Sequence, residues 1–334
     1  MTVDRRIALV SAGGTISSVA SGSREFVEYG ASGRKVGPEE LLLEVPEAAL
    51  EATVLPLVFH KGNSLAIGEP EWLVLNRLLH DAAKSMGPLD GVVITHGTAT
   101  MEQTAYFLSL TLKTAYPVVL VGAMRPLRVL GSDASINLVN ATRLAASETA
   151  EGVGVVVMMN GQIHAAREVT KGATYSIEAF VSPNSGVLGH VDADGGVMLY
   201  ARPTRRRAPN TEFDVRTLDA LPRVGIAYSY AGADATVIEA LMGSGVAGLV
   251  SAGHGAGSVT PREYEALQKA RQQGLVVVLA GQAGHGRVLH TERRRQDGFV
   301  VAGNLNPLKA RILLMLALTR TDDAQRIQGM FEEY

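Results

Sequence analysis

The residue types best suited to catalysis stand together in one short stretch that contains Thr95, His96 and Thr98. The run before them, residues 91–94, is apolar and rich in β-branched side chains, and it is too short for a helix. It predicts a buried strand, and the apolar spacing that follows predicts a helix. Two hydroxyls, an imidazole and a helix N-terminus would then meet at the end of a strand, where open parallel sheets place their ligands. We therefore look for chemistry at this turn.

A second turn of this kind follows the first apolar run of the chain and contains Gly13, Gly14 and Thr15. Two glycines after a strand allow a tight turn and bring backbone amides close to a ligand. The turn has neither the GxGxxG pattern nor a Walker loop, so a nucleotide-binding Rossmann-like enzyme has little support. The hydroxyls of Thr15 and Thr98 could also be plain cap or turn hydroxyls. For His96 we favour a packed turn residue over a base.

The composition is that of a globular protein with a substantial core. The chain has 334 residues, of which 46% are hydrophobic and 19% charged, and this length suits one large domain or, preferably, two. The net charge of −2 points to neither nucleic acid nor an anionic membrane as a partner. Cysteine is absent, which excludes disulfides, thiolate nucleophiles and cysteine-bound zinc. We expect no cofactor and no metal.

The apolar run near the N-terminus, residues 7–10, is too short for the core of a signal peptide. No stretch of the sequence reaches membrane-spanning length. The sequence therefore predicts a cytoplasmic protein.

Strands alternate with helices as far as Tyr200, which predicts an α/β fold whose larger N-terminal domain has a mainly parallel sheet flanked by helices. Residues 17–38 are polar and glycine-rich, and a loop of this length directly after Thr15 favours an active-site lid. Thr100 is expected to cap the helix that follows the turn at Thr98, with Gln103 as its capping-box partner. Residues 163–171 are expected to be extended.

Three further buried strands and two helices predict a smaller C-terminal α/β domain. Its last strand precedes a helix that begins at Asn306-Pro307, an N-cap followed by proline at the first helical position. The expected division is 1–202 for the catalytic domain, 203–221 for a linker and 222–334 for the smaller domain.

Seven short blocks of the sequence resemble the bacterial L-asparaginase/glutaminase family. They follow the family's order over essentially the whole chain, and they are Ala12-Gly13-Gly14-Thr15-Ile16, Thr95-His96-Gly97-Thr98, Gly122-Ala123-Met124-Arg125-Pro126, Arg167-Glu168-Val169-Thr170-Lys171, Ser182-Pro183-Asn184, Ser251-Ala252-Gly253 and Asn304-Leu305-Asn306-Pro307-Leu308-Lys309-Ala310-Arg311. Any one block is weak evidence, whereas seven in register are strong evidence.

The resemblance implies a two-domain α/β enzyme that hydrolyses a side-chain amide through an acyl-enzyme. It also implies a homotetramer of two close dimers, in which the smaller domain of a neighbouring subunit closes each site. Thr15 would be the nucleophile, Tyr29 its partner in the lid, and Thr98 with Lys171 a second hydroxyl–base pair. The substrate-binding positions that the resemblance implies are Gly14, Asn63, Ser64, Gly97, Ala99 and Ala123.

These residue types suit the chemistry. A threonine hydroxyl is a poor nucleophile at neutral pH and needs an adjacent base. A lysine can be that base if its pKa falls, which burial away from carboxylates favours. Backbone amides of Gly14, Thr98 and Ala99 are candidate donors to the oxyanion. Without the resemblance, Lys171 would be interpreted as a solvated lysine before a glycine.

The chain departs from the family at Ala99, because the family ordinarily has His-Gly-Thr-Asp at this turn. That aspartate binds the α-ammonium of the substrate and belongs to a threonine–lysine–carboxylate group. In the smaller domain a family asparagine that reaches the neighbouring site falls on Ala256, and Glu292 only approximately matches an acidic residue. A buried ammonium without its partner costs about 2–5 kcal/mol.

Two substrate classes therefore stay open for an amidohydrolase of this type. L-Asparagine is the family default, and the alternative is an amide with a blocked or absent α-amine, or a cyclic amide. Glu102, one helical turn beyond Ala99, could supply the missing charge. A rival of another class is a catalytically silent ligand-binding or assembly protein on the same scaffold. The joint presence of Thr15, Thr98 and Lys171 argues against that rival.

Overall fold

The computed structural model describes residues 5–32, 34–60 and 64–334. Contacts between Cα atoms divide the chain into two compact units, Met1–Thr217 and Leu218–Tyr334. Each unit has its own sheet.

The division falls inside the segment that the sequence analysis expects as a linker, residues 203–221. Part of this segment is bonded to the first unit. Lys113 Nζ donates to the carbonyl oxygen of Thr211 at 2.6 Å, and Thr211 Oγ1 donates to the carbonyl oxygen of Leu110. Ala208 N also donates to Ser109 O at 2.7 Å. These bonds tie the stretch to helix α5 and its C-terminal end.

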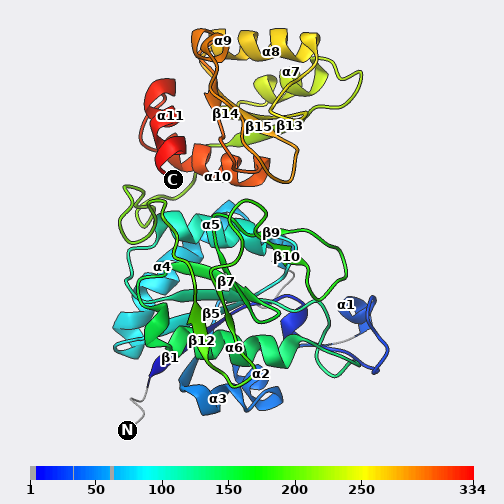
Figure 1. The fold of residues 1–334 in the computed structure, drawn as a ribbon, viewed down its shortest axis with the longest axis vertical. Helices are drawn as coiled ribbons and strands as arrows, with labels where there is room; N and C mark the ends of the chain where they lie inside the picture. Colours follow the sequence, from blue (N-terminus) through cyan, green and yellow to red (C-terminus); the bar gives the residue numbers. More distant parts are fainter. Residues whose placement is uncertain (1–4, 33, 61–63) are drawn as a thin grey trace. The chain divides into compact units, whose positions relative to one another are not determined.

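An eight-stranded sheet forms the centre of the first unit (Figure 1), in the order β12-β11-β8-β7-β6-β5-β1-β4. The five strands from β7 to β4 are parallel, and each of the pairs β7–β8, β8–β11 and β11–β12 is antiparallel. The strands are β1 (Arg6–Ala12), β4 (Thr53–Val58), β5 (Gly91–His96), β6 (Val118–Val121), β7 (Val155–Met159), β8 (Gln162–Ala165), β11 (Gly189–Val191) and β12 (Val197–Leu199). The predicted α/β fold with a mainly parallel sheet is confirmed.

Helices cover both faces of this sheet (Figure 1), with α4 and α5 on one face and α2, α3 and α6 on the other. Side chains alternate between the faces along each strand. Ile7 and Leu9 of β1 accordingly pack in one cluster with Leu138 and Leu144 of α6. The helices are α2 (Pro38–Glu44), α3 (Ala48–Glu51), α4 (Glu69–Met86), α5 (Met101–Thr111) and α6 (Ala134–Ala146).

The remaining helices and strands of the first unit are short and lie outside the eight-stranded sheet. They are η1 (Thr15–Ser17), β2 (Ser18–Val19), α1 (Tyr29–Ser32), β3 (Arg34–Lys35), η2 (Ser64–Ala66), η3 (Glu148–Ala150), β9 (Thr170–Lys171) and β10 (Phe180–Val181). The expectation of one extended run over residues 163–171 is wrong. Strand β8 ends at Ala165, whose carbonyl oxygen accepts from the amides of Glu168 and Val169 in a turn. The chain then forms the two-stranded ribbon β9–β10.

The second unit has a four-stranded parallel sheet in the order β13-β14-β15-β16. Its strands are β13 (Val224–Tyr228), β14 (Gly248–Gly253), β15 (Val276–Gly281) and β16 (Val300–Val301). Its helices are α7 (Thr236–Gly243), α8 (Pro261–Gln272), α9 (Glu292–Gln296), α10 (Pro307–Ala317) and α11 (Ala324–Glu333). The predicted smaller α/β domain is confirmed.

One predicted helix cap is confirmed and another is wrong. Asn306 caps α10, since its side chain accepts from Lys309 N at 2.9 Å, as predicted. Thr100 occupies the N-cap position of α5, but its side chain makes no cap bond, so the predicted capping box is wrong. Its hydroxyl instead donates to the carbonyl oxygen of Ser64 at 3.3 Å. A bond to another loop has replaced the local one.

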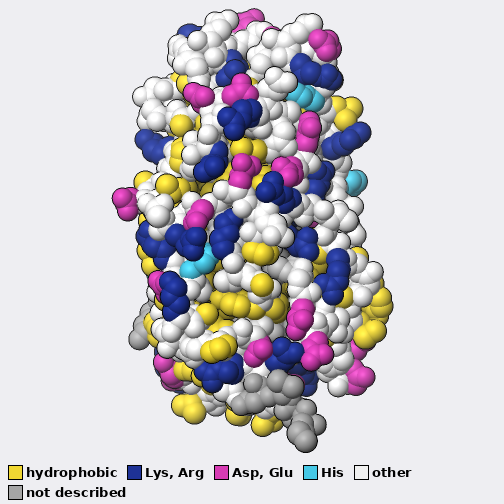
Figure 2. Space-filling model, turned by 90° about the vertical axis from the view of Figure 1, so that its left-hand side faces the viewer, with side chains coloured by type: hydrophobic (Ala, Val, Ile, Leu, Met, Phe, Trp, Pro, Cys, Tyr) yellow, Lys and Arg dark blue, Asp and Glu magenta, His cyan; other side chains and the backbone are white. Residues whose placement is uncertain are grey.

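The surface drawn in Figure 2 carries Lys and Arg side chains interspersed with Asp and Glu. This mixture agrees with a net charge of −2. None of the helices in the described part of the chain is long and apolar enough to cross a membrane.

The loops after β1, β4 and β5 pack so closely at two glycines that no side chain would fit there. A Cβ added to Gly14 would overlap the backbone of Gly97, and one added to Gly97 would overlap Ser64 Oγ. Gly14 also has a φ of 91°, which L side chains rarely adopt. These contacts hold the loops that precede Thr15 and Thr98 together.

Replacement of Gly97 by alanine tests this packing. Gly97→Ala should destabilise the protein by at least 1–3 kcal/mol, roughly the cost of overpacking a close contact, and lower its melting temperature. Gly329→Ala is the matched control, because no atom lies within 4 Å of a Cβ added to this glycine of α11. The control should be neutral or stabilising by up to about 1 kcal/mol. Equal melting temperatures for the two variants would contradict the packing argument.

Candidate active site

Thr15 follows directly from the Gly14 turn and begins η1. Its Oγ1 lies 2.7 Å from the hydroxyl of Tyr29, which belongs to the short helix α1. The lid segment returns to the turn through the ribbon β2–β3, which pairs Ser18 with Lys35. The structure therefore brings together the two residues that the resemblance pairs, although they are 14 positions apart.

Thr98 and Lys171 form the second pair. Lys171 Nζ donates to Thr98 Oγ1 at 2.7 Å, across 73 positions of sequence. Thr98 is only 8% exposed. Burial lowers the pKa of the Lys171 ammonium below its ordinary value of 10.5, which makes the neutral amine more accessible. The interpretation of Lys171 as a solvated residue does not fit this contact.

Glu102 is a member of this cluster that sequence reasoning treated only as a substitute charge. Its side chain is buried, at 5% exposure, and its Oε2 accepts from the backbone N–H of Lys171 at 3.0 Å. The carboxylate therefore binds the main chain of the lysine and leaves Nζ to Thr98. No local sequence signal could have revealed this bond, because its partners are 69 positions apart.

His96 is packed, as predicted, but it is the last residue of β5 and not part of the turn. Its ring is fully buried, with Nδ1 2.9 Å from Gly97 O and Nε2 3.0 Å from Thr104 Oγ1. A carbonyl oxygen can only accept, so Nδ1 carries the proton and Nε2 accepts from the Thr104 hydroxyl. That hydroxyl in turn accepts from Trp72 Nε1 at 3.0 Å. Burial lowers the pKa of His96 to about 4, and the imidazole is neutral at pH 7.

The turn after β6 is held by a residue that the sequence analysis did not single out. The carboxylate of Asp133 accepts from the backbone amides of Met124 and Arg125, at 3.0 and 2.9 Å. Asn137 Nδ2 donates to the carbonyl oxygen of Gly122 at 3.1 Å. Ala123, an expected substrate-binding residue, is fully buried inside this turn.

The other expected binding residues differ in their surroundings. Ser64 is buried and its backbone is tied to Thr100, whereas Asn63 lies outside the described residues. Ala99 is exposed, one position beyond Thr98. A methyl group therefore stands where the resemblance expects a carboxylate.

Two residues that the resemblance connects with a neighbouring subunit lie in the second unit. The carbonyl oxygen of Ala256 accepts from Arg294 Nη2 at 2.9 Å. Glu292 begins α9 and accepts from Gln296 Nε2 at 3.2 Å. Both are engaged with their own unit.

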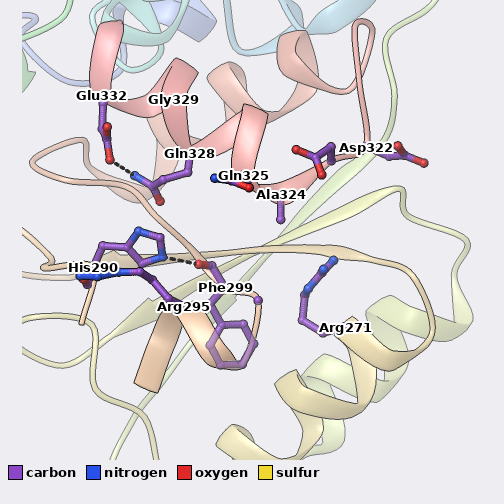
Figure 3. Close-up of a pocket in the computed structure, with 12 residues that line it drawn as sticks. Arg271, His290, Arg295, Phe299, Asp322, Ala324, Gln325, Gln328, Gly329 and Glu332 are labelled. Atoms are coloured by element: carbon purple, nitrogen blue, oxygen red, sulfur yellow. Dashed lines mark hydrogen bonds between the residues drawn. The ribbon is translucent and has the colours of Figure 1, made fainter. Parts of the chain in front are cut away.

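A cavity of about 860 Å³ also lies in the second unit (Figure 3). Gln328 and Glu332 of α11 are bonded to each other at 3.2 Å and face His290 and Phe299 on the opposite wall. None of its lining residues is one that the sequence analysis assigned to the site. No group of three or more His, Cys, Asp or Glu residues suited to a metal ion occurs in the described ranges.

Comparisons with known proteins agree with the geometry. The family model for the N-terminal domain of asparaginase matches residues 6–205, and the model for the glutaminase/asparaginase C-terminal domain matches residues 223–331. The glutaminase-asparaginase of Pseudomonas fluorescens biotype A is 39% identical over 98% of this chain and 90% of its own. L-asparaginase 2 of Escherichia coli is also 39% identical, over 98% of this chain and 93% of its own.

A solved structure extends this agreement to three dimensions. The crystal structure of a probable cytoplasmic L-asparaginase from Campylobacter jejuni has a TM-score of 0.94 and 37% identity, covering 99% of this chain and 100% of that one. The chain thus belongs to the asparaginase/glutaminase family, whose members are hydrolases that act on the carbon–nitrogen bonds of amides.

Proposed function

We propose that this protein cleaves a carboxamide through a covalent acyl-enzyme on Thr15. The observation that carries the proposal is the presence of two threonine hydroxyls, each with a hydrogen-bonding partner at 2.7 Å that could take part in proton transfer. Thr15 Oγ1 contacts the Tyr29 hydroxyl, and Thr98 Oγ1 contacts Lys171 Nζ. A threonine nucleophile needs such a partner.

In the first step Thr15 Oγ1 would attack the amide carbon and pass its proton to the Tyr29 oxygen, which releases its own hydroxyl proton towards the amide nitrogen. Backbone amides of Gly14, Thr98 and Ala99 are the candidate donors to the oxyanion. The carbon–nitrogen bond then breaks, and the nitrogen takes up a proton and leaves as ammonia or an amine. Water next attacks the ester, releases the acid and restores the Thr15 hydroxyl.

Lys171 would act in this scheme as a neutral base for Thr98. Desolvation is the physical cause that lowers its pKa, and the nearby carboxylate of Glu102 bonds to its backbone amide. With alanine at position 99, the family's carboxylate is absent beside it. Desolvation and the absence of a carboxylate at position 99 both favour the unprotonated amine.

The substrate has two candidates. The relatives from Pseudomonas fluorescens and Escherichia coli are named for glutaminase and asparaginase activity, which favours L-asparagine or L-glutamine. The exposed methyl group of Ala99 favours an amide without a free α-amine, because an ammonium at this position would lose hydration and gain no ion pair. We propose the second class as the preferred substrate.

Assembly and location complete the proposal. A homotetramer of two close dimers is supported by the family resemblance and by Leu43 and Leu50 of α2 and α3, which are 82% and 83% exposed in one chain. The Campylobacter jejuni neighbour is named cytoplasmic, whereas a Haemophilus influenzae relative at 39% identity is named periplasmic. We retain the cytoplasm as the expected compartment.

Thr15→Ala should abolish amide hydrolysis and leave the circular dichroism spectrum and assembly unchanged, because it removes only the attacking oxygen. Thr15→Ser is the matched control and should retain part of the activity. Ammonia release over a panel of amides, with mass spectrometry of the acyl-enzyme, measures both. Full activity in the alanine variant would make Thr98 the leading nucleophile. A wild-type protein that hydrolyses no amide of the panel would support the silent-scaffold alternative.

Lys171→Met should lower the acylation rate by roughly 10²–10⁴-fold, the usual scale for a positioned base. In wild type kcat/KM should rise with pH as Lys171 loses its proton, with a midpoint below 10.5, because burial lowers this pKa. Lys171→Arg keeps a positive charge but cannot lose its proton, so it should be impaired as well. An unchanged pH–rate profile in the methionine variant would contradict the role.

Ala99→Asp should shift preference towards L-asparagine by at least about tenfold, because it restores a carboxylate for the α-ammonium. The measurement is kcat/KM for L-asparagine against its N-acylated or deaminated analogue. Ala99→Asn has nearly the same shape without the charge and should leave the preference unchanged. If wild type hydrolyses free L-asparagine efficiently and rejects the analogue, another group supplies the missing charge.

A further inference from the structure

Glu102 is a buried carboxylate to which the proposed chemistry assigns no role. It lies in the first turn of α5, four residues after Thr98, and its side chain points back to the ribbon that carries Lys171. Within the described ranges, no basic side chain forms an ion pair with it. Its bond is to a backbone N–H, at 3.0 Å.

The ribbon that carries Lys171 needs such an anchor. Strand β9 pairs only with β10, through Lys171 with Phe180 and Thr170 with Val181, and neither strand belongs to the eight-stranded sheet. The register of the large sheet therefore does not fix the distance from this ribbon to the turn at Thr98. A lysine side chain has four rotatable carbons, so an unfixed backbone would let its amine occupy many positions.

Two bonds fix the lysine to one short segment of the chain, residues 98–102. Lys171 Nζ donates to Thr98 Oγ1 at 2.7 Å, and Lys171 N donates to Glu102 Oε2 at 3.0 Å. The two acceptors are four positions apart, Thr98 in the turn before α5 and Glu102 in the first turn of the helix. The side chain is therefore held at its amine end and at its backbone end by the same short segment.

We propose that Glu102 is a positioning residue that sets the reach of Lys171 to Thr98 by holding the lysine's backbone amide. The inference rests on the proposed function for its effect on turnover. A carboxylate suits the task, because hydrogen bonds to an ionised acceptor are shorter and stronger than neutral ones. The side-chain length matters equally, since the acceptor must extend from α5 to β9.

Two substitutions separate the bond from the charge. Glu102→Gln keeps the reach and an acceptor oxygen but removes the charge. Glu102→Asp keeps the charge but is one methylene shorter. We expect Glu102→Asp to lower kcat roughly 10–100-fold with little change in KM, the scale of a misplaced catalytic group. Glu102→Gln should stay close to wild type. Gln103→Ala, on the same helical turn without a bond to Lys171, is the control and should be unchanged.

Hydrogen exchange gives a readout that does not depend on turnover. The peptide that contains Lys171 should exchange its backbone amide faster in Glu102→Asp than in wild type or Glu102→Gln. If exchange accelerates while kcat is unchanged, the bond exists but the positioning role is wrong. If Glu102→Gln is impaired while Glu102→Asp stays close to wild type, the charge and not the reach of the side chain matters, and the inference is overturned.

The failure of this inference is distinguishable from failure of the proposed function. Inactivity of wild type on every amide, or full activity of Thr15→Ala, would refute the acyl-enzyme proposal. The exchange difference between the two Glu102 variants would still report whether the carboxylate holds the ribbon. Unaltered exchange at Lys171 in Glu102→Asp would refute the anchor itself.

Discussion

The contact on which the site depends is the close approach of two backbones at Gly14 and Gly97. Strands β1 and β5 are neighbours in the sheet, with Ala12 paired with His96, so their following turns lie side by side. Neither turn has a side chain at the contact, and Ser64 fills the remaining space over Gly97. Each glycine is followed at once by a threonine. The spacing of adjacent strands, about 4.8 Å, therefore keeps the two hydroxyls in one small region.

Local signals predicted most of the fold, and a non-local contact caused one of the errors. Residues 91–94 are β-branched and apolar, which is a property of the segment itself, and they form part of β5. The cap at Asn306 also involves only neighbouring residues. The capping box at Thr100 failed because its hydroxyl bonds to Ser64, 36 positions away. An error of another kind is the turn after Ala165, which local backbone bonds close although the sequence there reads as extended.

The candidate site shows the same contrast between local sequence signals and long-range contacts. Thr15 and Thr98 could be located from their positions after buried strands, whereas Tyr29 and Lys171 depended on the resemblance to a family. Bonds across 14 and 73 positions have no signature in composition or periodicity. The anchoring bond of Glu102 is of this long-range kind, and it became visible only in three dimensions.

The buried imidazole of His96 makes the stability of the fold depend on pH. The pKa of His96 is about 4 in the fold and 6.5 in a free chain, so between these values the unfolded chain binds a proton that the folded chain does not. Its contribution to stability is present above pH 6.5 and is lost progressively as the pH falls towards 4. Burial is what keeps the ring neutral, and the ring is packed beside the turn that carries Gly97 and Thr98. Acidification therefore destabilises the fold through a residue of the site itself, and a titration of the unfolding free energy across this interval would measure the effect.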